Sequence, residues 1–116
     1  MEIGVFAHEF GHIFGIPDLY DTDGSSEGVG EWCLMASGSW GGNGSSPETP
    51  VHMCAWVKKE LGWVTPINIT SYQGPLSVPN AEENSVVYRM WRDGTIGNQY
   101  FLIENRQRIG FDVNIS

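Results

Sequence analysis

The sequence predicts a small α+β fold, in which a buried helix and a second helix precede an antiparallel β hairpin. Three observations predict it. Apolar residues lie almost all the way round a helix at residues 2–14, which is typical of a buried helix. Residues 28–49 are rich in Gly, Ser and Pro, which favours a loop. After Trp63 the pattern changes to short apolar strands separated by turn residues.

The length and charge of the chain restrict its organisation and its partners. A chain of 116 residues forms one domain at most. We expect residues 1–116 to be a single partial domain, with the helices and the loop in residues 1–64 and a β-rich segment in residues 65–116. The net charge of −8 argues against nucleic acid or an anionic membrane as a partner. The sequence has no apolar run of membrane-spanning length, and from its first residues we expect no signal peptide in this chain.

Candidate metal-binding and catalytic residues lie in the first predicted helix, which contains His8-Glu9-Phe10-Gly11-His12. Residues four apart lie on one helix face, so both imidazoles can reach one metal ion. Glu9 points to the side of that face, where it can hold a metal-bound water rather than the metal. This pattern is the H-E-x-x-H motif of zinc peptidases.

The residues after His12 predict where the helix ends and what the third ligand is. Gly15 accepts a positive φ and ends the helix, and Pro17 prevents its continuation. The chain then turns back and brings Asp18 beside the histidines. Zinc accepts two imidazoles and a carboxylate and keeps its fourth position for water. Asp21 is the rival third ligand, because a longer turn would bring it round instead.

The Gly-rich loop contains Met35, which we expect in a tight turn beneath the metal site. Such a Met-turn is the other mark of the metzincin pattern, although a methionine by itself is more often core filler. The loop continues to Trp40, and its large aromatic residues favour an ordered segment over a flexible linker.

The second helix is predicted to begin with Thr49 as N-cap and Pro50 as first residue, and to run to Leu61 before Gly62. Strands are expected at residues 64–70, 74–78, 85–91 and 99–107. Asp93-Gly94 lies between the last two and is a turn signal, so this pair predicts an antiparallel hairpin.

Two further groups of residues leave alternatives open. The acidic turn with Asp21, Asp23 and Glu27 offers the hard oxygen ligands that calcium prefers, but a solvated acidic loop is the favoured interpretation. Cys33 and Cys54 either pair in an oxidising compartment or remain buried free thiols. Their spacing does not indicate metal ligands.

Four stretches resemble the immune inhibitor A family of secreted zinc metallopeptidases. They are HEFGHIFGIPDLYD (residues 8–21), GEWCLMASGSWGG (30–42), AWVKKELGWV (55–64) and YFLIENRQRIGFD (100–112). The resemblance implies a metzincin-like, zinc-dependent endopeptidase with His8, His12 and Asp18 at the metal and Glu9 as catalytic base. It also implies secretion and a protein or peptide substrate. Because His8 follows so closely on the first residue, we expect a fragment of the catalytic domain.

In this enzyme hypothesis, zinc would lower the pKa of its bound water to near 7. Glu9 accepts the proton as the water attacks a peptide carbonyl, and passes it to the leaving amine. The alternative is a truncated, non-catalytic remnant that binds zinc or a protein partner. A purely structural zinc site is a weaker alternative, because such sites are closed and usually rich in Cys.

Overall fold

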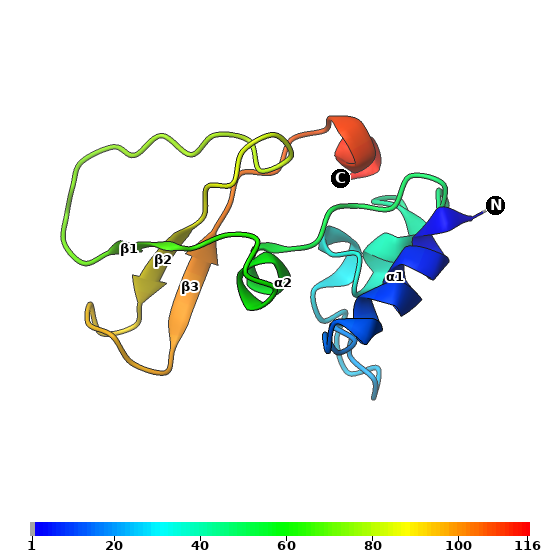
Figure 1. Cartoon of the computed structure of the whole chain (residues 1–116), viewed down its shortest axis with the longest axis horizontal. Coiled ribbons are helices and arrows are strands. Elements are labelled where there is room, and N and C mark those ends of the chain that lie inside the picture. Colours follow the sequence, from blue (N-terminus) through cyan, green and yellow to red (C-terminus); the bar gives the residue numbers. More distant parts are fainter. Residues whose placement is uncertain (1) are drawn as a thin grey trace. The chain divides into compact units, whose positions relative to one another are not determined.

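The computed structural model describes residues 2–116, which form two compact units. The first unit contains the chain up to Cys54 together with Gln107–Ser116, and the second contains Ala55–Arg106. Figure 1 shows two α-helices, α1 (Ile3–Ile13) and α2 (Ala55–Glu60), and three strands, β1 (Ile67–Ile69), β2 (Tyr88–Trp91) and β3 (Tyr100–Ile103). The described residues also form three short 3-10 helices, which are η1 (Gly30–Trp32), η2 (Ser37–Trp40) and η3 (Gly110–Asn114). Within residues 2–116, no helix has the length and apolar character needed to cross a membrane.

Helix α1 ends where the sequence predicts. The backbone N–H of Gly15 donates to the carbonyl of His12 at 2.9 Å, and Gly15 has a φ of 82°. This left-handed conformation costs glycine nothing, because it has no Cβ. The chain therefore reverses at Gly15, and the segment that follows returns toward the helix.

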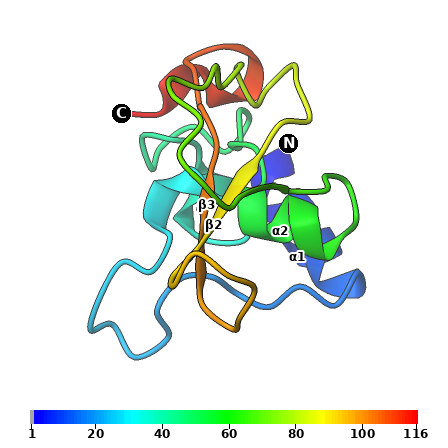
Figure 2. The same cartoon turned by 90° about the vertical axis from the view of Figure 1, so that its left-hand side faces the viewer.

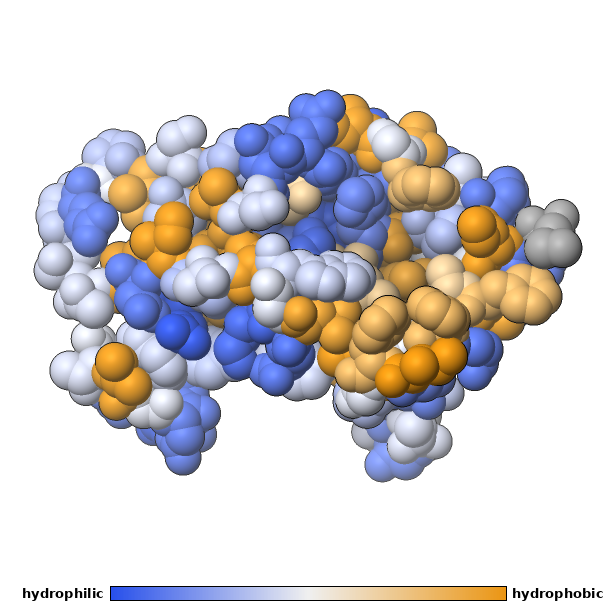
Figure 3. Space-filling view, in the orientation of Figure 1, coloured by the Kyte–Doolittle hydropathy of each residue, from blue (hydrophilic) through white to orange (hydrophobic). Residues whose placement is uncertain are grey.

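The prediction that α1 is buried is correct for one side only. The residues that it buries are Gly4, His8 and Gly11. Its large apolar side chains are exposed, and they include Phe6 at 64% and Ile13 at 73%. A helix with apolar residues all the way round would be buried only if other segments packed against both of its sides. The described residues pack against one side of α1. Figure 3 shows apolar side chains gathered on the surface over α1.

The covered side of α1 packs against the Gly-rich loop. The α1 helix contacts η2, and the N–H of Gly4 donates to the carbonyl of Pro47 at 2.8 Å. A Cβ at Gly4 would overlap the carbonyl of Ser39, so only glycine allows this approach. Residues 28–49 therefore form an ordered layer of turns and 3-10 helices, and not a flexible linker.

The second helix is shorter than predicted, because residues 50–54 are extended. Their backbone groups have partners outside any helix. The N–H of Val51 donates to the carbonyl of Gly38 at 3.0 Å, and the N–H of His52 donates to Asp112 Oδ1 at 2.8 Å. The predicted N-cap side chain of Thr49 is also engaged, since its hydroxyl donates to the carbonyl of Ser46 at 3.2 Å. These hydrogen bonds outweigh the helix signal of Thr49 and Pro50.

The second unit contains a three-stranded sheet in the order β1-β2-β3. The predicted hairpin is confirmed, because β2 and β3 are antiparallel, with Tyr88 opposite Ile103 and Trp91 opposite Tyr100. Strand β1 pairs with β2 in parallel, and a long loop connects the two (Figures 1 and 2). The core of this unit contains Ala55, Val64 and Val87, with Leu102 packed against them.

The strand predicted at residues 74–78 does not form. Its last carbonyl, that of Val78, accepts a hydrogen bond from the side chain of Asn105 at 2.8 Å. A neighbouring N–H, that of Ala81, donates to the backbone carbonyl of Asn105 at 2.7 Å. Hydrogen bonds with Asn105, which follows β3, thus replace the strand pairing expected for this loop. A sequence pattern does not reveal such a contact.

Glu104 connects α2 to the strand side of this unit. Its Oε1 accepts from the N–H of Ala55 at the start of α2 (3.1 Å). Its Oε2 pairs with Lys58 at 3.2 Å, and both side chains are less than one-sixth exposed. A carboxylate at a helix N-terminus also interacts favourably with the helix dipole.

We therefore expect Glu104→Ala to lower the free energy of unfolding by about 2 kcal/mol, because it removes a charged hydrogen bond and leaves Lys58 without this partner. The matched control is Glu60→Ala, which removes an exposed carboxylate from the same helix and its contact with Lys59. We expect the control to change the free energy by less than about 0.5 kcal/mol. Urea unfolding followed by circular dichroism measures both values, and equal effects would contradict this role of Glu104.

Candidate metal centre

Two histidines on α1 face the same point, as their spacing predicts. The ring centroids of His8 and His12 are 5.0 Å apart. The His8 side chain is 9% exposed and that of His12 is 33% exposed. The site is therefore walled by protein on the His8 side and reaches solvent on the His12 side.

Backbone carbonyls fix the orientation of both rings. His8 Nδ1 donates to the carbonyl of Leu34 at 2.8 Å, and His12 Nδ1 donates to the carbonyl of Ile16 at 2.7 Å. Since Nδ1 carries the proton, Nε2 of each neutral imidazole carries a lone pair. This is the arrangement that metal-binding histidines require.

Asp18 lies against both Nε2 atoms. Its Oδ1 is 2.8 Å from Nε2 of His8 and 3.2 Å from Nε2 of His12. Within residues 2–116, these three residues form a group whose candidate ligand atoms all lie within 4.8 Å of one another. A proton on one Nε2 can bridge a single pair, whereas a divalent metal satisfies three acceptors at once. The donor set therefore fits a metal ion.

The environment of Asp18 favours its ionised form. Burial raises the pKa of Asp18. Hydrogen bonding with Tyr20 and His8 and the charge interaction with both imidazoles lower it by more, so the pKa of Asp18 lies below its usual value. The hydrogen bond to Asp18 in turn raises the pKa of Tyr20. The Tyr20 side chain therefore interacts with the carboxylate. Its ring stacks on that of His8 with centroids 6.3 Å apart.

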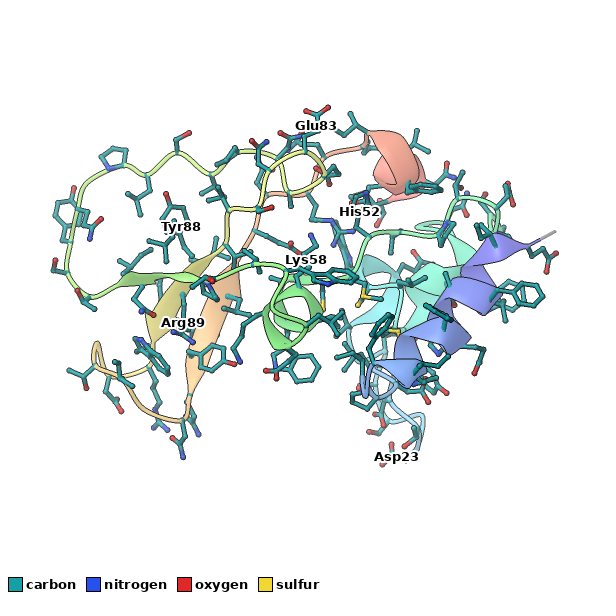
Figure 4. All side chains as sticks on the ribbon, viewed as in Figure 1. Asp23, His52, Lys58, Glu83, Tyr88 and Arg89 are labelled. Atoms are coloured by element: carbon teal, nitrogen blue, oxygen red, sulfur yellow. The ribbon has the colours of Figure 1, made fainter. Side chains whose placement is uncertain are left out.

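Asp21, the rival third ligand, lies in a self-contained turn. Its Oδ2 accepts from the hydroxyls of Ser25 at 2.7 Å and Ser26 at 3.0 Å, and its Oδ1 accepts from the N–H of Asp23 at 3.2 Å. The hydrogen bonds from these three residues lower the pKa of Asp21 to about 2. Figure 4 shows Asp23 near the tip of this loop. In the described part of the chain this turn forms no convergent three-ligand group, so the calcium site stays a prediction.

Glu9 lies beside the histidines but outside the convergent group. It is exposed, and it lines a cavity of about 250 Å³ together with His8, Tyr20 and Trp40. Glu9 thus borders the same space as His8, and the loop that carries Trp40 also lines it.

Met35 packs directly beneath this part of α1. The side chain is fully buried, and a Cβ at Gly11 would overlap its sulfur. The turn is tight, because the N–H groups of Ala36 and Gly38 both donate to the carbonyl of Cys33, at 3.0 and 3.1 Å. The carbonyl of Met35 accepts from the N–H of Leu19 at 2.8 Å, next to Asp18. The turn therefore supports both the helix and the returning segment.

Sequence reasoning missed the groups that orient the candidate ligands. The carbonyls of Leu34 and Ile16 give no sequence signal, because every residue has a carbonyl. Tyr20 does have a signal, since a residue two positions after Asp18 lies on the same side of an extended segment.

A family model matches the part of the chain that contains this group, and curated proteins match up to half of the chain. The family described as immune inhibitor A peptidase M6, catalytic domain, matches residues 1–64. The pre-pro-metalloprotease PrtV of Vibrio cholerae serotype O1, in each of two strains, is 45% identical over 60 residues, which are 50% of this chain. Immune inhibitor A of Bacillus thuringiensis subsp. alesti is 47% identical over 49 residues, which are 39% of this chain. The matches span 6% and 7% of those proteins. No solved structure matches the chain.

The contact between Gly11 and Met35 predicts a strong coupling. We expect Gly11→Ala to destabilise the protein by about 1–3 kcal/mol, because the added methyl group overlaps a buried side chain. In the double variant with Met35→Ala the methyl group enters the space that the methionine leaves. The double variant should then be at least about 1 kcal/mol more stable than the sum of the two single changes predicts. Additive changes in urea unfolding would show that the two residues do not touch.

Proposed function

Because the chain belongs to the immune inhibitor A family of M6 peptidases, we propose that it carries the catalytic centre of a zinc-dependent endopeptidase that cleaves proteins or peptides. One observation carries the proposal. Two imidazole Nε2 atoms and one carboxylate oxygen converge, and each ring is oriented by a carbonyl hydrogen bond. That arrangement supports a metal ion bound by His8, His12 and Asp18.

Zinc is the proposed metal because of the donor set. Two imidazoles and one carboxylate are common ligands of catalytic zinc, which keeps a fourth position for water. An ion such as calcium prefers six to eight oxygen ligands, and this group supplies mainly nitrogen. When bound, zinc supplies Lewis acidity and the activation of water.

The residues of the chain have distinct proposed roles. His8 and His12 would hold the metal through their imidazole nitrogens, and Asp18 would hold it through its carboxylate, which the Tyr20 side chain would help to position. Glu9 is the proposed general base, which accepts a proton from the attacking water and passes it to the leaving amine. Its place beside the histidines, on the cavity that Trp40 lines, supports this role.

We also propose that the protein acts outside the cell. The name of the Vibrio relative, pre-pro-metalloprotease, describes a precursor protein. An acidic chain with a net charge of −8 is compatible with that location.

The alternative proposal is a zinc-binding or protein-binding module without hydrolysis. The exposed apolar side of α1, with Phe6 at 64% and Phe10 at 59% exposed, favours it, because such a surface suits contact with another protein segment. Bound zinc without peptide cleavage would support this alternative. Zinc together with cleavage would support the endopeptidase.

The third ligand is tested with a matched pair of variants. We expect Asp18→Asn to lower zinc affinity by at least about 100-fold, because the amide removes a charged ligand. Asp21→Asn is the control, since it makes the same change three positions later, and we expect unchanged affinity. Zinc content by atomic absorption and competition with a chelator measure both. Loss of zinc in Asp21→Asn alone would assign the third ligand to Asp21.

The general base is tested by separating metal binding from hydrolysis. We expect Glu9→Ala to keep one equivalent of zinc and to lower the rate of peptide hydrolysis by about 100-fold to 10,000-fold. Glu48→Ala removes another exposed carboxylate of the same unit and should leave both values unchanged. The measurement is cleavage of a fluorogenic peptide beside the zinc content. If Glu9→Ala loses zinc as well, Glu9 acts on the metal and not as the base.

A further inference from the structure

The two cysteines of the chain lie next to each other, although they are 21 positions apart. The backbone N–H of Cys54 donates to Cys33 Sγ at 3.2 Å. The adjacent N–H of Leu34 donates to the carbonyl of His52 at 3.3 Å, so the two segments run side by side. Figure 4 labels His52 on the extended segment that leads to Cys54.

The two thiols differ in access and in chemistry. Cys33 is fully buried, whereas Cys54 is half-buried and reaches the surface. The hydrogen bond between the Cys33 thiol and the Cys54 sulfur raises the pKa of Cys33, and burial and the charge of an ionised Cys54 raise it further. Cys33 therefore keeps its proton when Cys54 ionises, and Cys54 is the sulfur that an external reagent can reach.

We propose that Cys33 and Cys54 form an intramolecular disulfide in an oxidising compartment, and that this crosslink holds the segment that orients His8. The location rests on the proposed action outside the cell, whereas the pairing rests on the geometry alone. The oxidant is a small disulfide such as oxidised glutathione.

The reaction balances in two exchange steps. The Cys54 thiolate attacks the small disulfide, forms a mixed disulfide and releases one glutathione thiolate. The Cys33 thiol then loses its proton and attacks the sulfur of Cys54, which releases the second glutathione thiolate. The two protein thiols lose two protons and two electrons, and one oxidised glutathione becomes two reduced molecules.

The crosslink has a consequence for the metal centre. Cys33 immediately precedes Leu34, whose carbonyl accepts the Nδ1–H of His8. A bond from Cys33 to Cys54 ties this carbonyl to the extended segment at residues 50–54. Both thiols are free in the structure, where the hydrogen bond of His8 is already formed. The crosslink would strengthen this arrangement, so we expect the oxidised protein to be more stable and to retain zinc better than the reduced one.

The first test counts thiols by mass and needs no variant. The reduced chain is equilibrated with reduced and oxidised glutathione, quenched with acid, unfolded and alkylated. We expect a monomer that takes up no alkyl group, and that takes up two after treatment with dithiothreitol. Two alkyl groups without reduction, a stable mixed disulfide with glutathione, or a disulfide-linked dimer would each overturn the proposal. This readout does not depend on zinc or hydrolysis, so it remains decisive if the proposed function fails.

The second test measures the effect of reduction on the folded protein. We expect dithiothreitol to lower the thermal unfolding midpoint of the oxidised wild type by on the order of 10 °C. The Cys33→Ala/Cys54→Ala variant is the matched control, because the reductant should leave its midpoint unchanged. An equal shift in both proteins would assign the effect to the reagent. An unchanged midpoint in the wild type would show that the crosslink does not hold this segment.

Discussion

The first unit depends on one electrostatic constraint, which is that two imidazole nitrogens and one carboxylate oxygen meet at a single point. The Nε2 atoms of His8 and His12 and the Oδ1 of Asp18 all lie there. The rings cannot rotate away without losing their hydrogen bonds to the carbonyls of Leu34 and Ile16. A buried acceptor without a donor or a cation is costly. A bound cation would remove that cost, so the proposed metal binding would be linked to the folding of this unit.

Close packing of backbone on backbone holds this arrangement. Helix α1 meets the Gly-rich loop through Gly4 and Gly11, the residues with no side chain to separate the two segments. The Met35 side chain fills the space under Gly11. The large apolar side chains of the helix point the other way and are exposed. The side of α1 that contains His8 thus packs through glycines, while the large apolar side chains of the helix are exposed.

The extended segment at residues 50–54 has more than one structural role. Its backbone pairs with the Met35 turn and with Asp112 of η3, so it joins the loop to the C-terminal part of the first unit. It also carries Cys54 beside Cys33. These contacts explain why the segment is not helical. They also support the turn that contains Leu34, whose carbonyl orients His8. The metal group therefore depends on residues far from it in the sequence.

The sequence by itself determined the local features. The spacing of His8 and His12, the helix end at Gly15 and the β2–β3 hairpin all follow from short-range patterns, because a helix turn, a positive φ and a tight turn each involve only a few adjacent residues. Tertiary contacts decided the rest. They set the carbonyl partners of the rings, the extended course of residues 50–54 and the exposed side of α1, since each depends on which distant segment packs nearby.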